Sequence, residues 1–104
     1  MPQQLKDRNI IFFGAPETLR DVADKVGTRA LARIMDVNTS RLYAWRTRRQ
    51  WPGVEMQVRI HDVTAQLARE QRIPEAWIIT AGDWADAWRK SAEWEASKLA
   101  DGDA

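Results

Sequence analysis

The apolar residues of this chain recur mostly at helical spacing, and they divide it into a series of short segments. Leu19, Val22 and Val26 lie three or four positions apart, after Pro16 and before Gly27. Proline is tolerated in the first turn of a helix, and glycine commonly follows the last turn. This spacing therefore predicts a first helix that ends at Gly27.

Two shorter helices are predicted next, separated by a tight turn. Thr28 is expected to cap the first of them. Its apolar side comprises four residues, Leu31, Ala32, Ile34 and Met35. After a break at residues 36–38, either Asn38 or Thr39 can cap a helix from Ser40 to about Arg49. Leu42 and Trp45 are its expected inward residues, and Trp51-Pro52-Gly53 is a stop and turn.

The segment from about Val54 to Arg72 fits two patterns. Met56, Ile60, Val63 and Leu67 form a helical stripe. Residues 54–60 also alternate between apolar and polar side chains, as a strand or wing would. We prefer the helix, because the helical pattern continues beyond Ile60 without a turn signal.

The last third of the chain is rich in tryptophan. Pro74 opens a short segment containing Trp77, Ile78 and Ile79, and Gly82-Asp83 is expected to break and recap the chain. A final helix from Trp84 to about Leu99 would place Trp84, Trp88, Ser91 and Glu95 on one face, with Trp94 at its edge. The whole pattern predicts an all-α fold of five or six helices.

Three regions follow from this pattern. Residues 1–15 are expected to form an N-terminal arm, which includes the apolar run Ile10–Phe13. That run is a candidate extended segment, core plug or subunit contact. Residues 16–72 would form the helical core, and residues 73–104 a Trp-rich segment that mediates oligomerisation.

Composition narrows the classes of function. The 104 residues suffice for one ordinary domain. There is no cysteine, and His61 is the only histidine, so a metal site is not expected. No apolar run approaches the roughly 20 residues of a membrane-spanning helix, and no signal-peptide core is visible. We expect a cytoplasmic protein without a cofactor.

The charge distribution is uneven although the net charge is only +1. Between Thr28 and Arg59, seven arginines oppose Asp36 and Glu55, which gives that segment a charge of +5. From Asp83 to Ala104, three basic residues oppose six acidic ones, which gives −3. Arginine forks suit phosphate and guanine, so the basic middle indicates a nucleic-acid-binding segment.

Residues 28–47, TRALARIMDVNTSRLYAWRT, fit the twenty-residue pattern of a helix-turn-helix. Ala32 takes the fifth place, where only a small side chain fits between the two helices. Val37 takes the tenth, and Leu42 and Trp45 take the fifteenth and eighteenth, where apolar residues pack. Asp36 stands at the ninth place, where a left-handed backbone usually selects glycine. Aspartate tolerates that conformation better than most residues.

The segment resembles the helix-turn-helix of the phage Cro, CI and CII regulators and related prokaryotic repressors. The likeness is closest to the CII shape and covers about residues 19–67. It is carried by Gly27-Thr28, Val37-Asn38, Ser40, Trp45-Arg46 and Trp51-Pro52. It implies a lambda-repressor-like fold that binds double-stranded DNA and acts in the nucleoid.

The resemblance implies that residues 40–49 enter the major groove with their N-terminal end toward the bases. The residues expected to contact DNA are Arg29, Asn38, Thr39, Ser40, Arg41, Tyr43, Ala44, Arg46, Thr47, Arg48 and Arg49. Arg41 is the first candidate for a guanine contact. Thr39 and Ser40 suit phosphate. Tyr43, Ala44 and Thr47 suit a thymine methyl or a phosphate, and the remaining arginines suit the DNA backbone.

One such helix contacts only a few base pairs, so a homodimer on a palindromic operator is expected. Trp77, Trp84, Trp88 and Trp94 are the candidate interface residues. Two alternatives stay open: another phage DNA-handling factor, such as a small terminase subunit or an excisionase-like protein, and a protein-interaction adaptor that uses the Trp-rich helix. An enzyme is not expected, because no nucleophile setting or phosphate loop is visible, and no small-molecule substrate is indicated.

Overall fold

A computed structural model describes residues 14–103 of the chain, with side chains described through residue 97. Regular structure in this part is entirely helical, with five α-helices, one short 3₁₀ helix and no strand. The elements are α2 (Ala15–Val26), α3 (Thr28–Met35), α4 (Thr39–Arg46), α5 (Val54–Arg69), η1 (Glu75–Trp77) and α6 (Ala81–Asp103). The predicted all-α fold with five or six helices is confirmed. Residues 1–13 of the predicted N-terminal arm, which include the run Ile10–Phe13, lie outside the described residues, whereas Ala15 at its end is the buried first residue of α2 and not part of an arm.

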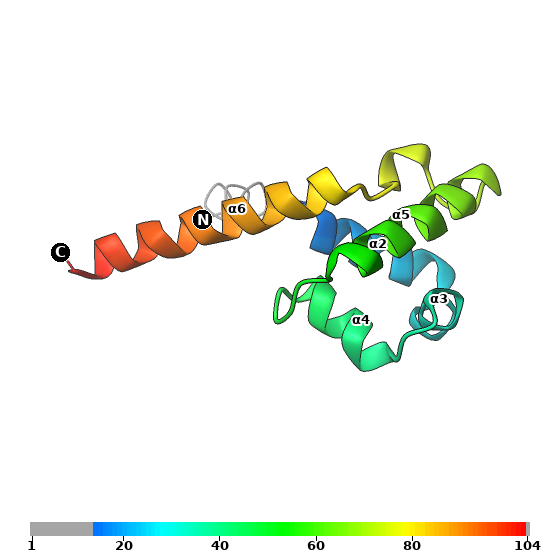
Figure 1. Cartoon of the computed structure of the whole chain (residues 1–104), viewed down its shortest axis with the longest axis horizontal. Helices are drawn as coiled ribbons and strands as arrows, with labels where there is room; N and C mark the ends of the chain where they lie inside the picture. The colour runs from blue at the N-terminus through cyan, green and yellow to red at the C-terminus, as the bar shows by residue number, and fades with distance from the viewer. Residues whose placement is uncertain (1–13, 104) are drawn as a thin grey trace.

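One hydrophobic core holds these helices together. α2 lies against α3, α4 and α6, while α5 lies against α3, η1 and α6 (Figure 1). Every helix except η1 contributes to the buried set, which includes Leu19, Val22, Leu31, Met35, Leu42, Trp45, Ile60, Leu67, Trp84 and Ala87. Burying such side chains contributes roughly 1.5–3 kcal/mol each, which is the main drive for folding. The short α3 and α4 are therefore stabilised by packing rather than by length.

The core crosses the domain boundary that we predicted at residue 72. Ile73, Ile79, Trp84 and Ala87 belong to the same buried cluster as the helices before them. Thr64 of α5 reinforces the connection, because its buried hydroxyl accepts a hydrogen bond from the Ile79 backbone N–H at 3.1 Å. The first turns of α6 are thus part of the core and not a separate segment.

α6 begins three residues before the predicted start at Trp84, and Gly82 lies inside it instead of breaking the chain. The reason is a reciprocal cap. The Thr80 backbone N–H donates to the Asp83 carboxylate at 2.8 Å, and the Asp83 backbone N–H donates to the Thr80 hydroxyl at 3.1 Å. This pairing satisfies amide donors that would otherwise be unpaired at the helix start.

The alternative of a strand over residues 54–60 is wrong. Val54 and Val58 are exposed, whereas Ile60 is buried and Met56 packs against the core. A strand would place all four side chains on one face. A helix separates them, which is the observed arrangement.

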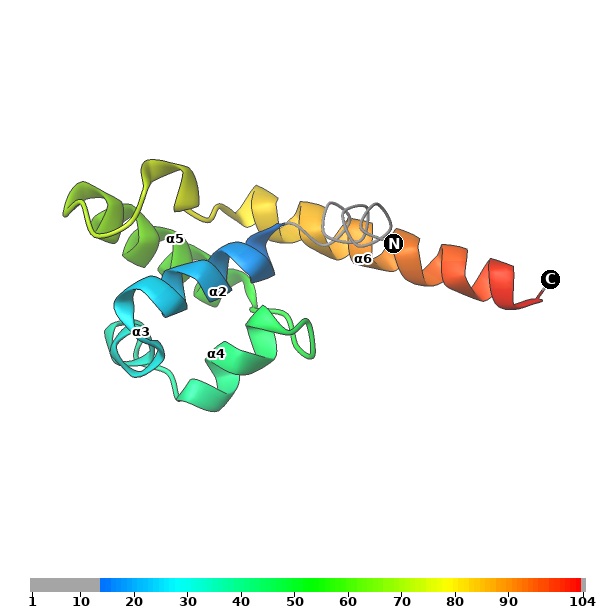
Figure 2. The same cartoon turned by 180° about the vertical axis from the view of Figure 1, so that it is seen from behind.

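α6 extends beyond the rest of the molecule. Figures 1 and 2 show its C-terminal half projecting away from the other helices, and the chain measures 50 × 29 × 22 Å along its principal axes. The buried face of α6 is formed by Trp84 and Ala87, and half-buried Ser91 and Trp94 continue it. Trp88, predicted to share a face with Trp84, is 57% exposed because it points away from this stripe.

Candidate nucleic-acid interface

α3 and α4 form a helix-turn-helix unit held by the apolar residues that the spacing identified. Ala32, Leu42 and Trp45 are buried, and Val37 in the turn packs against the core. Their burial leaves the opposite side of α4 exposed. Ile34, predicted on the apolar side of α3, is exposed instead, because Leu31, Ala32 and Met35 already fill the buried side.

The turn between the two helices depends on the left-handed conformation of Asp36, at φ 58° and ψ 47°. The Asp36 N–H donates to the Arg33 carbonyl at 3.1 Å, and the Val37 N–H donates to the Ala32 carbonyl at 3.0 Å. This is the Schellman arrangement, which satisfies the last carbonyls of a helix. The conformation expected at the ninth place of the pattern is therefore present with aspartate in it.

Asn38 caps α4, as one of the two predicted options. Its side-chain oxygen accepts a hydrogen bond from the Arg41 backbone N–H at 2.8 Å. Thr28, in contrast, is the first residue of α3 and not its cap, because Gly27 occupies the cap position without a side-chain bond. Thr39, Ser40 and Arg41 are exposed in the first turn of α4. They are thus available for contact with a ligand.

Arg41 lies over the ring of Trp45, with its guanidinium carbon 5.3 Å from the ring centroid. Trp45 is anchored in the core, so it offers Arg41 a fixed aromatic surface. A cation over an aromatic face is attracted by the ring quadrupole. The guanidinium of Arg41 therefore has a preferred position against Trp45, where α4 meets the core.

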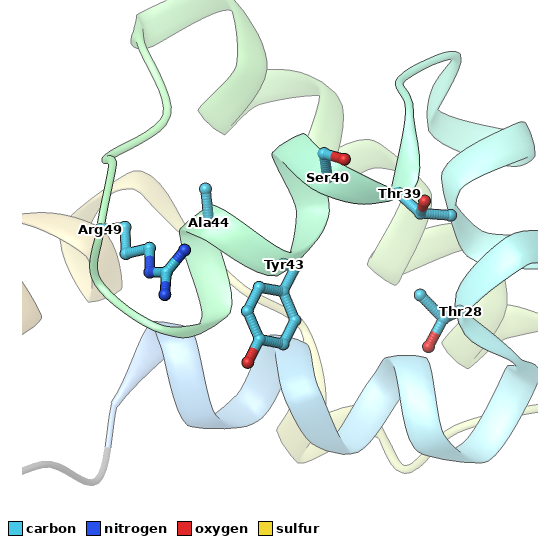
Figure 3. Close-up of a pocket in the computed structure, with 6 residues that line it drawn as sticks. All are labelled: Thr28, Thr39, Ser40, Tyr43, Ala44 and Arg49. Atoms are coloured by element: carbon cyan, nitrogen blue, oxygen red, sulfur yellow. The ribbon is translucent and has the colours of Figure 1, made fainter.

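A second aromatic–arginine cluster lies further along α4. The guanidinium carbons of Arg46 and Arg49 lie 5.6 and 5.9 Å from the centroid of the Tyr43 ring. Tyr43 and Arg49 also line a hollow of about 390 Å³ together with Thr28, Thr39, Ser40 and Ala44 (Figure 3). The hollow thus joins the first turns of α3 and α4 to the turn that follows α4.

α4 ends at Arg46, earlier than the predicted end near Arg49. Arg48 adopts a left-handed conformation at φ 64°, and the Arg49 N–H closes the helix by donating to the Ala44 carbonyl at 3.0 Å. Thr47 stays exposed, and its hydroxyl donates to the Tyr43 carbonyl at 2.8 Å. The chain reverses here, so Arg48 and Arg49 point in different directions.

Arg48 is turned inward, which corrects its prediction as a DNA contact. Its guanidinium pairs with the Glu17 carboxylate, and its Nε donates to the Ser91 hydroxyl at 2.9 Å. The Arg48 side chain is only 16% exposed. Arg59 is also engaged with the protein, because it donates to the Met35 carbonyl at the end of α3 at 3.0 Å. Because Glu17 neutralises Arg48, the outward positive charge of the basic segment is smaller than its sequence indicates.

The other predicted contact residues all lie in α3, in α4 or in the turns on either side of α4. Those that are exposed are Arg29, Asn38, Thr39, Ser40, Arg41, Tyr43, Thr47 and Arg49, and those that are half-buried are Ala44 and Arg46. Thr28 was missed as a lining residue of the hollow. Its place one residue after Gly27, at the expected start of a helix, is the signal that could have identified it.

The four tryptophans predicted at an oligomer interface do not behave alike. Trp84 is 1% exposed and makes an edge-to-face contact with Trp51, with centroids 6.2 Å apart. It belongs to the core of its own chain, so its assignment to an interface is wrong. Trp77 packs against the same core. Trp88 and Trp94 line a hollow of about 280 Å³ with Arg48, Trp51, Ser91, Ala92 and Glu95.

Within the described residues, none of the helices is long and apolar enough to cross a membrane. In the same part of the chain, no cluster of three or more His, Asp or Glu side chains is placed to hold a metal ion. Comparison of the chain with known protein families, with curated proteins and with solved structures finds no match.

Proposed function

We propose that this chain is a sequence-specific DNA-binding regulator that inserts α4 into the major groove of double-stranded DNA. One observation carries the proposal. α4 buries Leu42 and Trp45, while Arg41, Tyr43 and Thr47 are exposed on its other sides. In helix-turn-helix proteins, the element that contacts base edges is a short helix with one side packed against the core and the other side exposed.

The residues at the two ends of α4 support the same proposal. Thr39 and Ser40 present hydroxyl groups at its start, and Arg46 and Arg49 present guanidiniums at its end. Hydroxyls and arginine forks supply most of the phosphate contacts that set the register of a protein on DNA. Arg41 lies between these groups and is the candidate for base recognition.

A homodimer is part of the proposal, since one helix reads too few base pairs for useful specificity. Two copies of α4 would occupy successive major grooves about 34 Å apart on a palindromic operator. The middle of α6, with exposed Trp88 and half-buried Trp94, is the surface we assign to self-association. The proposed mechanism is occupancy of the operator, which blocks or positions RNA polymerase.

Selection of bound sequences from a random duplex DNA pool tests the proposal. We expect a palindromic motif whose half-sites lie about one helical turn apart. The control is the same selection with Arg41→Ala, which should relax the motif at one position in each half-site. A pool that is not enriched over repeated rounds with the wild-type chain would contradict the proposed function.

A second candidate is a protein-interaction adaptor, which the hollow between Trp51, Trp88 and Trp94 favours. The two candidates differ in their response to salt. DNA affinity should fall steeply with salt, with a log–log slope of about −0.9 per phosphate contact. An apolar protein contact should respond weakly, so a salt titration of each binding reaction separates them.

A further inference from the structure

Tyr43 occupies an unusual place on the exposed surface of α4. Tyr43 is 50% exposed, yet two guanidiniums lie against its ring. Arg46 reaches the ring from one turn further along α4, and Arg49 reaches it from the turn after the helix, where its backbone N–H bonds the Ala44 carbonyl. Two cations from different local structures therefore converge on one aromatic side chain.

The convergence has an energetic consequence for binding an anion. A free arginine side chain samples many rotamers, and ordering it on binding costs entropy. A guanidinium that already rests on an aromatic ring has lost part of that freedom. Arg46 and Arg49 would thus be placed for a ligand before the ligand arrives.

The position of the pair indicates which ligand it suits. Arg49 and Tyr43 line the hollow with the hydroxyl residues Thr28, Thr39 and Ser40, as Figure 3 shows. Among the described residues, none of those that line this hollow is acidic. A surface of hydroxyls and guanidiniums without carboxylates suits the phosphates of a nucleic-acid backbone.

We propose that Tyr43 is a positioning residue, whose ring holds Arg46 and Arg49 as a two-pronged clamp for the DNA backbone. This inference rests on the proposed function and deepens it. The aromatic ring of Tyr43, and not its hydroxyl group, holds the two guanidiniums. Removal of the hydroxyl should therefore leave DNA binding unchanged. Tyr43 then contributes to affinity through the two arginines rather than through a contact of its own.

The test measures binding of a fluorescein-labelled duplex of mixed sequence by anisotropy over a range of salt concentrations. A mixed-sequence probe reports phosphate contacts, which do not depend on sequence. We expect Tyr43→Phe to match the wild type. We expect Tyr43→Ala to bind about 5- to 10-fold more weakly and to have a log–log slope shallower by up to roughly 1.8, which is two phosphate contacts. Arg69→Ala, which removes an exposed cation from α5, is the matched control and should leave the slope unchanged.

A double-mutant cycle makes the test specific to positioning. In an Arg46→Ala, Arg49→Ala background, Tyr43→Ala should cause no further loss of affinity. Equal losses in both backgrounds, or a Tyr43→Phe variant as weak as Tyr43→Ala, would mean that Tyr43 contacts DNA directly and would overturn the inference. Thermal unfolding of each variant checks the fold, and Tyr43→Leu replaces Tyr43→Ala if the latter is unstable.

The outcome also separates this inference from the proposed function. A wild-type chain that shows no salt-dependent binding to the duplex would contradict both. A wild-type chain that binds, together with a Tyr43→Ala variant of unchanged affinity and slope, would overturn the positioning role alone.

Discussion

Arg48 and Glu17 form a two-pronged ion pair that joins the turn after α4 to the first turn of α2. The two side chains are only 16% and 14% exposed. The Nε of Arg48 completes the arrangement by donating to the Ser91 hydroxyl of α6 at 2.9 Å. One guanidinium therefore connects three elements, and it fixes the end of the candidate recognition helix relative to the core.

Replacing Glu17 by glutamine should destabilise the protein. The change leaves the Arg48 guanidinium largely buried without its counter-charge, and loss of one partner of a fully buried pair costs about 3–5 kcal/mol. Partial exposure reduces this, so we expect about 2 kcal/mol less free energy of unfolding in urea. Glu93→Gln, an exposed position on α6, is the control and should change stability by less than about 0.5 kcal/mol. Equal effects of the two changes would contradict a structural role for the pair.

Gln71→Gly should stabilise the chain. Gln71 follows α5 with φ 60°, and the Arg72 N–H donates to the Leu67 carbonyl at 2.9 Å in the same closing arrangement as at Asp36. A left-handed conformation strains any side chain and suits glycine. The relief exceeds the entropy that glycine adds to the unfolded state, so we expect a gain of about 0.5–1 kcal/mol in chemical denaturation. Gln71→Ala keeps the strain and should show no gain; a gain as large as that of glycine would contradict the explanation.

The helix-turn-helix spacing could be predicted because it depends on local packing. Ala32, Leu42 and Trp45 are buried as expected, and Asp36 takes the left-handed conformation that its place in the pattern requires. These positions follow from the period of the helix and the geometry of a tight turn. Once the buried side of α4 is known from these positions, the remaining residues of α4 can be assigned to its exposed side.

The end of α4 could not be predicted, because it depends on a contact that is distant in sequence. Arg48 and Arg49 are neighbours of the same type, yet Arg48 pairs with Glu17, 31 positions earlier, and Arg49 lies on the exposed hollow. No neighbouring residue in the sequence indicates that Arg48 is turned inward and Arg49 outward. The start of α6, in contrast to the end of α4, depends on a local contact. The Thr80–Asp83 cap matches a known sequence signature, a threonine followed three positions later by an acidic residue.

The sequence pattern likewise could not predict which tryptophans are buried in the core and which are exposed. The spacing of Trp84 and Trp88 fits one helical face, but the core meets α6 along Trp84 and Ala87. Which edge of a helix faces its neighbours depends on the packing angle of the whole element. The indole count alone therefore did not separate core residues from surface residues.

Arg41→Lys should separate charge from base recognition. Lysine keeps the positive charge but lacks the planar fork that stacks on Trp45 and that the proposal pairs with guanine. We expect discrimination between the selected operator and a duplex changed at the guanine to fall by on the order of 1–3 kcal/mol. The salt slope should stay close to that of the wild type, since the number of phosphate contacts is unchanged.

The matched control for this change is Arg33→Lys, at an exposed position of α3. It should alter neither discrimination nor slope. An Arg41→Lys variant that keeps full discrimination, together with an Arg41→Ala variant whose salt slope is shallower by about 0.9, would assign Arg41 to a phosphate instead of a base.

Trp84→Ala and Trp88→Ala should give opposite phenotypes, although the two residues are one helical turn apart. Trp84 is buried against Trp51, so its truncation leaves a cavity and should cost about 3–5 kcal/mol of unfolding free energy. Trp88 is 57% exposed, so its truncation should leave the stability of the monomer nearly unchanged. If the middle of α6 mediates self-association, Trp88→Ala should instead shift the sedimentation of the chain from dimer to monomer at tens of micromolar. Glu93→Ala, at an exposed position five residues further along α6, controls for the loss of side-chain bulk. A wild-type chain that sediments as a monomer at this concentration, or a Trp88→Ala variant that stays dimeric, would contradict the assignment of this surface to the dimer.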